Sequence, residues 1–210
     1  MASDNSVAAT GVRVDDISIA NPLCEAAAPT PSSVVSRKTH GAAGNFDIDL
    51  PLSGPSGVEC RRGQGTGQND HTIVVTFGGA PTVSGMRQAT VTSGVGMIGS
   101  NGVPNGGMVT VSGNTVTIPL TGVTNAQVLT VTLNGVTVGA NSGNVVIPMG
   151  VLLGDTNDSR SVNAGDALQT RGRSGQITDG TNFRSDVNPD GAIAAGDVII
   201  VRGQAGNSIP

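Results

Sequence analysis

An internal repeat near the end of the sequence constrains the possible fold of this chain more than any other feature. Residues 154–175 recur as residues 185–206, at a constant offset of 31 positions. The residues that are identical in the two copies are Asp155, Asn157, Ala164, Gly165, Asp166, Arg171, Gly172 and Gly175, which recur as Asp186, Asn188, Ala195, Gly196, Asp197, Arg202, Gly203 and Gly206. A duplication of this kind predicts two copies of one small structural unit.

Each copy opens with a twelve-residue loop that is rich in oxygen-bearing side chains. Ca²⁺ prefers hard oxygen ligands, and an EF-hand-type loop supplies them from positions 1, 3, 5, 7 and 12, with a backbone carbonyl at position 7. We therefore expect two Ca²⁺ ions. The predicted ligands are Asp155, Asn157, Ser159, the carbonyl of Ser161 and Asp166 in the first loop, and Asp186, Asn188, Asp190, the carbonyl of Ala192 and Asp197 in the second.

The alternative interpretation of either loop by itself is an Asx-rich turn that binds no metal, but the duplication argues against it. Position 8 is apolar in both loops, Val162 and Ile193, which predicts a short β-bridge between them. Loop two carries one more carboxylate, Asp190 in place of Ser159, and Pro189 is expected to stiffen it. The second site should therefore bind Ca²⁺ more tightly.

The segment from Leu153 to Gln204 resembles a type I dockerin, a family in which two calcium loops each precede a helix. The resemblance implies helices over Asp166–Ser174 and Asp197–Gln204, and docking onto a cohesin-like β-sandwich domain. Arg171 and Arg202 match the basic helix position of the family. Positions 10 and 11 are Ala-Gly in both loops, where cohesin-binding members often have Ser-Thr. Residues 36–41, 46–52 and 57–61 look like a segment that recurs before dockerins in secreted bacterial proteins.

The region before the repeat has the pattern of an all-β domain. Between residues 34 and 153, apolar and polar residues alternate in short runs such as 46–52, 72–77 and 128–133, and Gly- and Asn-rich turns separate them. This spacing predicts an antiparallel β-sandwich of the immunoglobulin-like type. The expected fold is therefore mainly β, with residues 34–153 as the sandwich and residues 154–210 as a small α dockerin-like module with two calcium loops.

Residues 1–33 are expected to be a strand followed by a Pro-containing linker. Val12, Val14, Ile17 and Ile19 alternate with polar residues, and Pro29 and Pro31 make the following segment semi-extended. A strand tethered in this way can complete the sandwich of a neighbouring copy. These four apolar residues are the predicted assembly strand.

Composition excludes several functional classes. Aromatic residues make up 1% of the 210 residues, with no Trp or Tyr, which argues against a carbohydrate-binding module and against binding of unpaired bases. The net charge of −4 provides no basic surface for nucleic acid. No apolar run approaches the roughly 20 residues that a membrane span needs. The resemblance implies an extracellular or cell-surface location of the secreted bacterial type.

The cysteines and histidines do not form the sequence pattern of a metal site, a redox site or a catalytic triad. Cys24 and Cys60 lack the C-x-x-C spacing of a metal or redox site, so a disulfide between them is predicted if the chain is secreted; two separate buried thiols are the alternative. His40 and His71 stand without a Gly-x-Ser-x-Gly motif, so we expect no catalytic triad and no enzyme.

Three hypotheses of function follow. The first is a non-enzymatic calcium-binding structural protein that assembles end to end into an extracellular filament or another homo-oligomer. The second is an appendage that docks onto a separate cohesin scaffold of a cell-surface or cellulosome-like complex. The third is a fragment of a secreted hydrolase whose catalytic part lies elsewhere.

Overall fold

The computed structural model describes residues 26–65 and 68–210, and it is mainly β with two α-helices. The predicted assembly strand, Val12, Val14, Ile17 and Ile19, lies outside the described residues, as does Cys24. The strands are β1 Ser33–His40, β2 Gly44–Asp49, β3 Val58–Glu59, β4 His71–Thr76, β5 Thr82–Val83, β6 Ala89–Ser93, β7 Met97–Ser100, β8 Val103–Pro104, β9 Thr110–Ser112, β10 Thr115–Thr121, β11 Gln127–Val138 and β12 Asn141–Val151; the helices are α1 Ala164–Gly172 and α2 Ala195–Gly203.

The strands form two sheets, which together we call the two-sheet region. The first has the order β2-β1-β4-β10-β7-β8, with β9 also paired to β10, and the second has the order β3-β12-β11-β5, with β6 also paired to β11. All pairs are antiparallel except β3 with β12. Ser112 of β9 pairs with Thr115 of β10 across a tight turn at Gly113 and Asn114.

The two sheets share one hydrophobic core, and the alternation in the sequence decides which side chains enter it. In β10, Val116, Ile118 and Leu120 are fully buried, and alternate residues of β11 and β12, such as Val131 and Ile147, contribute to the same cluster. Successive side chains of a strand point to opposite faces, so a period of two puts one apolar row toward the opposing sheet.

Residues 154–210, which we call the loop–helix segment, contain the duplication. The helices begin and end within two residues of the predicted limits. The prediction that Val162 and Ile193 pair with each other is wrong. Val162 exchanges backbone hydrogen bonds with Gly206 and Asn207 after α2, and Ile193 does so with Gly175 and Gln176 after α1. Each loop is therefore paired with the end of the other repeat, so the two copies interlock.

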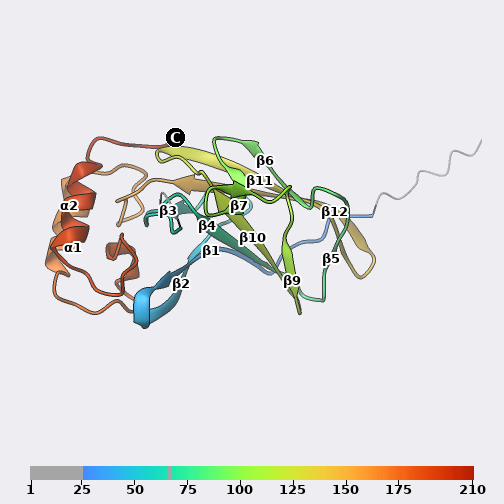
Figure 1. Cartoon of the computed structure of the whole chain (residues 1–210), viewed down its shortest axis with the longest axis horizontal. Helices are drawn as coiled ribbons and strands as arrows, with labels where there is room; N and C mark the ends of the chain where they lie inside the picture. The colour runs from blue at the N-terminus through green and yellow to red at the C-terminus, as the bar shows by residue number, and fades with distance from the viewer. Residues whose placement is uncertain (1–25, 66–67) are drawn as a thin grey trace, which may run out of the picture.

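The loop–helix segment packs against one end of the two-sheet region. A second apolar cluster joins Val58 and Leu152 of that region to Val162, Val187 and Val201. Figure 1 shows the helices at one end of the long axis, while the described chain begins at the opposite end, where Ala27 O accepts from Ser142 N at the start of β12 (3.1 Å). Neither helix in the described ranges is long and apolar enough to cross a membrane.

Candidate calcium-binding loops and their surroundings

Backbone amides hold the acidic side chains of the first loop inside it. Ser159 N and Arg160 N donate to Asp155 Oδ1 and Oδ2, both at 2.9 Å. Thr156 N and Asn163 N donate to the two carboxylate oxygens of Asp166, also at 2.9 Å. Asp155 and Asp166 are both fully buried. The loop thus encloses two carboxylates that its own amides orient.

The second loop repeats this arrangement at the offset of the duplication. Asp190 N and Gly191 N donate to Asp186 Oδ1 and Oδ2 at 3.2 and 2.9 Å. Ala194 N donates to Asp197 Oδ2 at 2.8 Å. Asp186 and Asp197 are fully buried, so both loops bury the acids of positions 1 and 12.

The remaining predicted ligands lie in the same loops. Ser159 N donates to Asn157 Oδ1, and Ser159 Oγ donates to Ser161 O, which is the predicted carbonyl ligand (3.1 and 3.0 Å). In the second loop Asp190 N donates to Asn188 Oδ1 and Ala192 N donates to Asp190 Oδ1 (3.3 and 3.0 Å). All ten predicted residues therefore lie in two compact loops.

The electrostatics of the buried carboxylates show the cost of placing them together. Desolvation raises the pKa of Asp155, and repulsion by Asp166 adds to the rise. Desolvation likewise raises the pKa of Asp197, and Asp186 and Asp190 add to it. For Asp186 desolvation acts upward, but hydrogen bonds from His40, Thr178 and Gly191 outweigh it and lower its pKa. A bound cation would relieve the repulsion in each loop.

The donor set fits a hard cation such as Ca²⁺. All the predicted ligand atoms are oxygens of carboxylate, amide, hydroxyl and carbonyl groups, which is the chemistry that Ca²⁺ selects. Across the described ranges, no three His, Cys, Asp or Glu side chains converge as a metal site.

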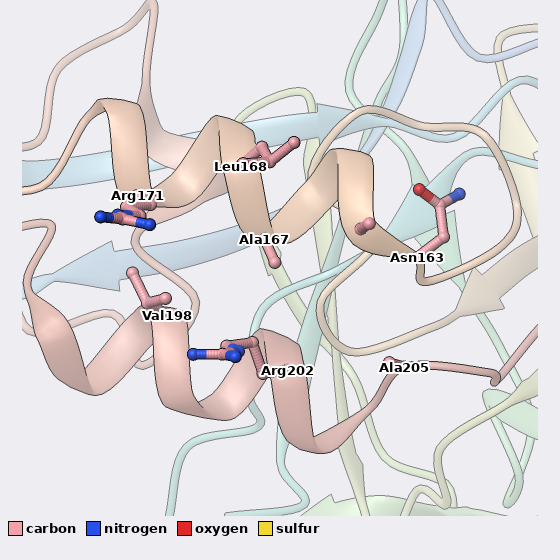
Figure 2. Close-up of a pocket in the computed structure, with 8 residues that line it drawn as sticks. Asn163, Ala167, Leu168, Arg171, Val198, Arg202 and Ala205 are labelled. Carbon is pink, nitrogen blue, oxygen red and sulfur yellow. The ribbon is translucent and has the colours of Figure 1, made fainter.

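The outer faces of the two helices form a shallow groove of about 420 Å³. Figure 2 shows Ala167 and Arg171 of α1 opposite Val198 and Arg202 of α2. Leu168 of α1 and Ile199, its counterpart in α2, are 66% and 70% exposed. Each helix therefore presents the same aliphatic and basic side chains to the outside.

A buried polar cluster lies between the two-sheet region and loop two. Glu59 and Arg61 form a fully buried ion pair (2.8 Å), and His40 Nδ1 lies 2.8 Å from Asp186 Oδ2. Lys38 is also buried, with Nζ donating to Asp70 O, and desolvation lowers its pKa to about 8. The sequence pattern alone assigns no functional role to His40 or Arg61. The only signal was that both belong to segments that looked like ones that recur before dockerins.

The other predicted residues are not brought into a site. Cys60 is a free, fully buried cysteine in the described part of the chain, and burial raises its pKa to about 11. Because Cys24 lies outside that part, the Cys24–Cys60 disulfide stays a prediction.

Comparisons of this chain with models of protein families, with curated proteins and with solved structures give no match. The geometry of the two loops, of the helix faces and of the polar cluster is therefore the basis for assigning a function.

Proposed function

We propose that this chain is an extracellular, non-enzymatic structural protein that binds two Ca²⁺ ions and assembles end to end into filaments. Its two-sheet region would be an immunoglobulin-like β-sandwich, and its loop–helix segment a dockerin-like module. The contacts between copies would be made by the strand of Val12, Val14, Ile17 and Ile19, by the loop–helix segment, or by both.

The observation that carries the calcium part is the repeated enclosure of acidic side chains. Two loops of the same sequence pattern bury an acid at position 1 and another at position 12, and their amides orient both carboxylates in the same way. Buried carboxylates that repel one another are stabilised by a cation. Asp155, Asn157, Ser159, Ser161 and Asp166 would hold one ion, and Asp186, Asn188, Asp190, Ala192 and Asp197 the other.

The end-to-end part is supported by the opposite positions of the two helices and of the first described residues. The exposed helix faces lie at one end of the long axis, and the described chain starts at the other end (Figure 1). A contact between different surfaces of successive copies is heterologous, and it produces a filament whenever the rotation between copies does not close a ring.

Electron microscopy and size-exclusion chromatography of the purified protein in calcium test the assembly. We expect long particles that are lost when the chelator EGTA is added. A chain that lacks residues 1–22 should stay folded and fail to form them, because the four apolar residues that would be buried in a neighbour contribute about 1.5–3 kcal/mol each. Truncated protein that assembles as well as the parent would contradict a role for the N-terminal strand.

The alternative is an appendage that docks onto a separate cohesin-like scaffold through the loop–helix segment. The matching exposure of Leu168 and Ile199 favours it, because the two helices offer equivalent docking surfaces. A monodisperse monomer in calcium would support this alternative, and replacement of both residues by Ser should then abolish scaffold binding without changing calcium binding.

A further inference from the structure

A buried hydrogen bond connects the two-sheet region to the second calcium loop. His40 ends β1, and its Nδ1 lies 2.8 Å from Asp186 Oδ2, with both side chains inaccessible to solvent. Arg61 Nη1 lies 3.1 Å from the other ring nitrogen, Nε2. A guanidinium group has only donors, so Nε2 must accept and the ring proton must reside on Nδ1. His40 therefore donates to Asp186.

The imidazole of His40 is fixed in this orientation. Phe46 and Phe183 stack on each other at 5.4 Å between ring centroids, and both meet the His40 ring edge to face, at 5.2 and 6.3 Å. Arg61 is itself held by the Glu59 carboxylate, by Ser36 O and by Phe46 O. A rotation of His40 would break the hydrogen bond from Arg61 and disturb two aromatic contacts.

The first loop provides an internal comparison. Asp155 Oδ2, which corresponds to Asp186 Oδ2, accepts a hydrogen bond from Arg160 N within its own loop. Asp186 Oδ2 accepts the equivalent bond from Gly191 N, and in addition bonds from His40 and Thr178. The extra donors fix the rotation of the Asp186 carboxylate, and Oδ1 therefore points into the loop.

The backbone of loop two also contacts the two-sheet region directly. A Cβ added to Gly41, which follows His40, would lie 2.2 Å from Asp190 O, and a Cβ added to Gly191 would lie 2.9 Å from His40 O. Both glycines have positive φ angles, +47° and +99°. The β1–β2 turn and loop two thus approach each other closely enough to exclude any side chain at these two positions.

We propose that His40 is a positioning residue of the second calcium site, so that β1 of the two-sheet region orients the ligand Asp186 directly, a contact for which Asp155 of the first loop shows no counterpart among the described residues. The inference rests on the proposed calcium function. It predicts that Ca²⁺ bound in loop two and the fold around β1 stabilise each other, because a coupling between two sites acts equally in both directions.

Calorimetric titration of the full chain with Ca²⁺ tests the proposal. D155A isolates loop two and D186A isolates loop one. In each background, H40N keeps a donor near the position of Nδ1, whereas H40Q places its amide near Nε2, where it accepts from Arg61 and leaves Asp186 without its donor. Loss of a residue that orients a metal ligand weakens binding by about 10- to 100-fold.

We expect H40Q to lower the Ca²⁺ affinity of loop two by about tenfold or more, and H40N to lower it by less than about threefold. The Ca²⁺ affinity of loop one should stay the same in both variants. Equal weakening of both loops, or no weakening of loop two, would overturn the proposal while leaving calcium binding intact. Absence of any calcium heat in the unaltered chain would overturn the proposed function as well.

A second measurement leaves His40 unchanged, so it does not depend on whether a His40 variant folds. In the D155A chain, the Nδ1 resonance of His40 in ¹⁵N NMR should shift with the same midpoint as the heat of calcium binding. A resonance that stays constant across the titration would overturn the proposal.

Discussion

Arg160 occupies position 6 of loop one, where loop two has Gly191, and it adopts a φ of +64° that side chains rarely take. Hydrogen bonds of the Arg160 side chain offset this unfavourable backbone conformation. Its guanidinium donates to Ser56 O in the two-sheet region (2.9 Å) and to Pro210 O (2.7 Å from Nε). Arg160 therefore anchors loop one at the expense of about 1 kcal/mol of backbone strain.

The burial of His71 should make the stability of the protein depend on pH. It lies at the start of β4, it is 5% exposed, and its Nδ1 is buried without a partner in the described structure. Desolvation, reinforced by the positive charge of Lys38, lowers its pKa to about 3. The folded state thus resists protonation of a group that ionises near pH 6.5 when unfolded.

The free energy of unfolding should therefore fall as the pH drops from about 6.5 to about 3, because the unfolded chain binds a proton there that the folded chain does not. The His71 contribution is on the order of 5 kcal/mol over this range. Chemical denaturation at several pH values and one calcium concentration measures the free energy of unfolding. This free energy should decline less steeply with falling pH in H71Q than in the parent. Parallel declines would show that His71 does not carry this dependence.

At the scale of elements, the two loops share a fold but differ in detail. Pro189 at position 4 has a φ of +22°, far from the value near −65° that its ring prefers, and Asp158 at the same position of loop one has +61°. Position 4 thus has a positive φ in both loops, which a proline ring disfavours, so the expected stiffening by Pro189 gives no ground for ranking loop two as the tighter site. The ranking of the two sites now rests on charge, on Gly191 and on the contact with His40.

Loop two should still bind Ca²⁺ more tightly, by on the order of tenfold or about 1.4 kcal/mol. It offers Asp186, Asp190 and Asp197, whereas loop one offers Asp155 and Asp166, and the spare acid Asp158 is directed to Arg184 (3.3 Å). Calorimetry of D166A, which retains loop two, and of D197A, which retains loop one, measures the difference. Tighter binding by D197A would reverse the ranking.

At the scale of the whole molecule, calcium binding and folding should be linked. The loop–helix segment shares an apolar cluster with Val58 and Leu152, and Arg62 N donates to Val187 O at 2.7 Å. Because burial and hydrogen bonds both cross this contact, the two regions should unfold together in one cooperative transition.

Removal of both Ca²⁺ ions should lower the melting temperature of the full chain by roughly 10–20 °C. Ligand at about 100 times its Kd stabilises a protein by about 2.7 kcal/mol per site, and each kcal/mol corresponds to about 2–4 °C at this chain length. Calorimetric scans in calcium and in excess chelator make the measurement, with magnesium as the control ion. Superimposable scans would contradict the linkage.

The local features could be predicted from the sequence because they depend on local chemistry. The duplicated loops and the alternating strands follow from residue spacing, since Asp and Asn at fixed positions shape a loop and a period of two shapes a strand. The two short helices were implied by the resemblance to dockerins. The mainly β fold and the compact position of all ten predicted ligand residues in two loops belong to this category. Whether Ca²⁺ occupies those loops stays a prediction.

Only the tertiary structure decided how distant segments meet. No spacing rule places His40 beside Asp186, 146 positions away, or puts Val162 next to Asn207 rather than next to Ile193. These contacts arise because the apolar faces of the loops and of β3 are buried together, and that packing brings His40, Arg61 and Glu59 into a site that is inaccessible to solvent, where each polar group needs a partner. The sequence by itself determined the two loops, whereas packing determined that loop two meets His40 of β1 and that loop one meets both Ser56 and the end of the chain.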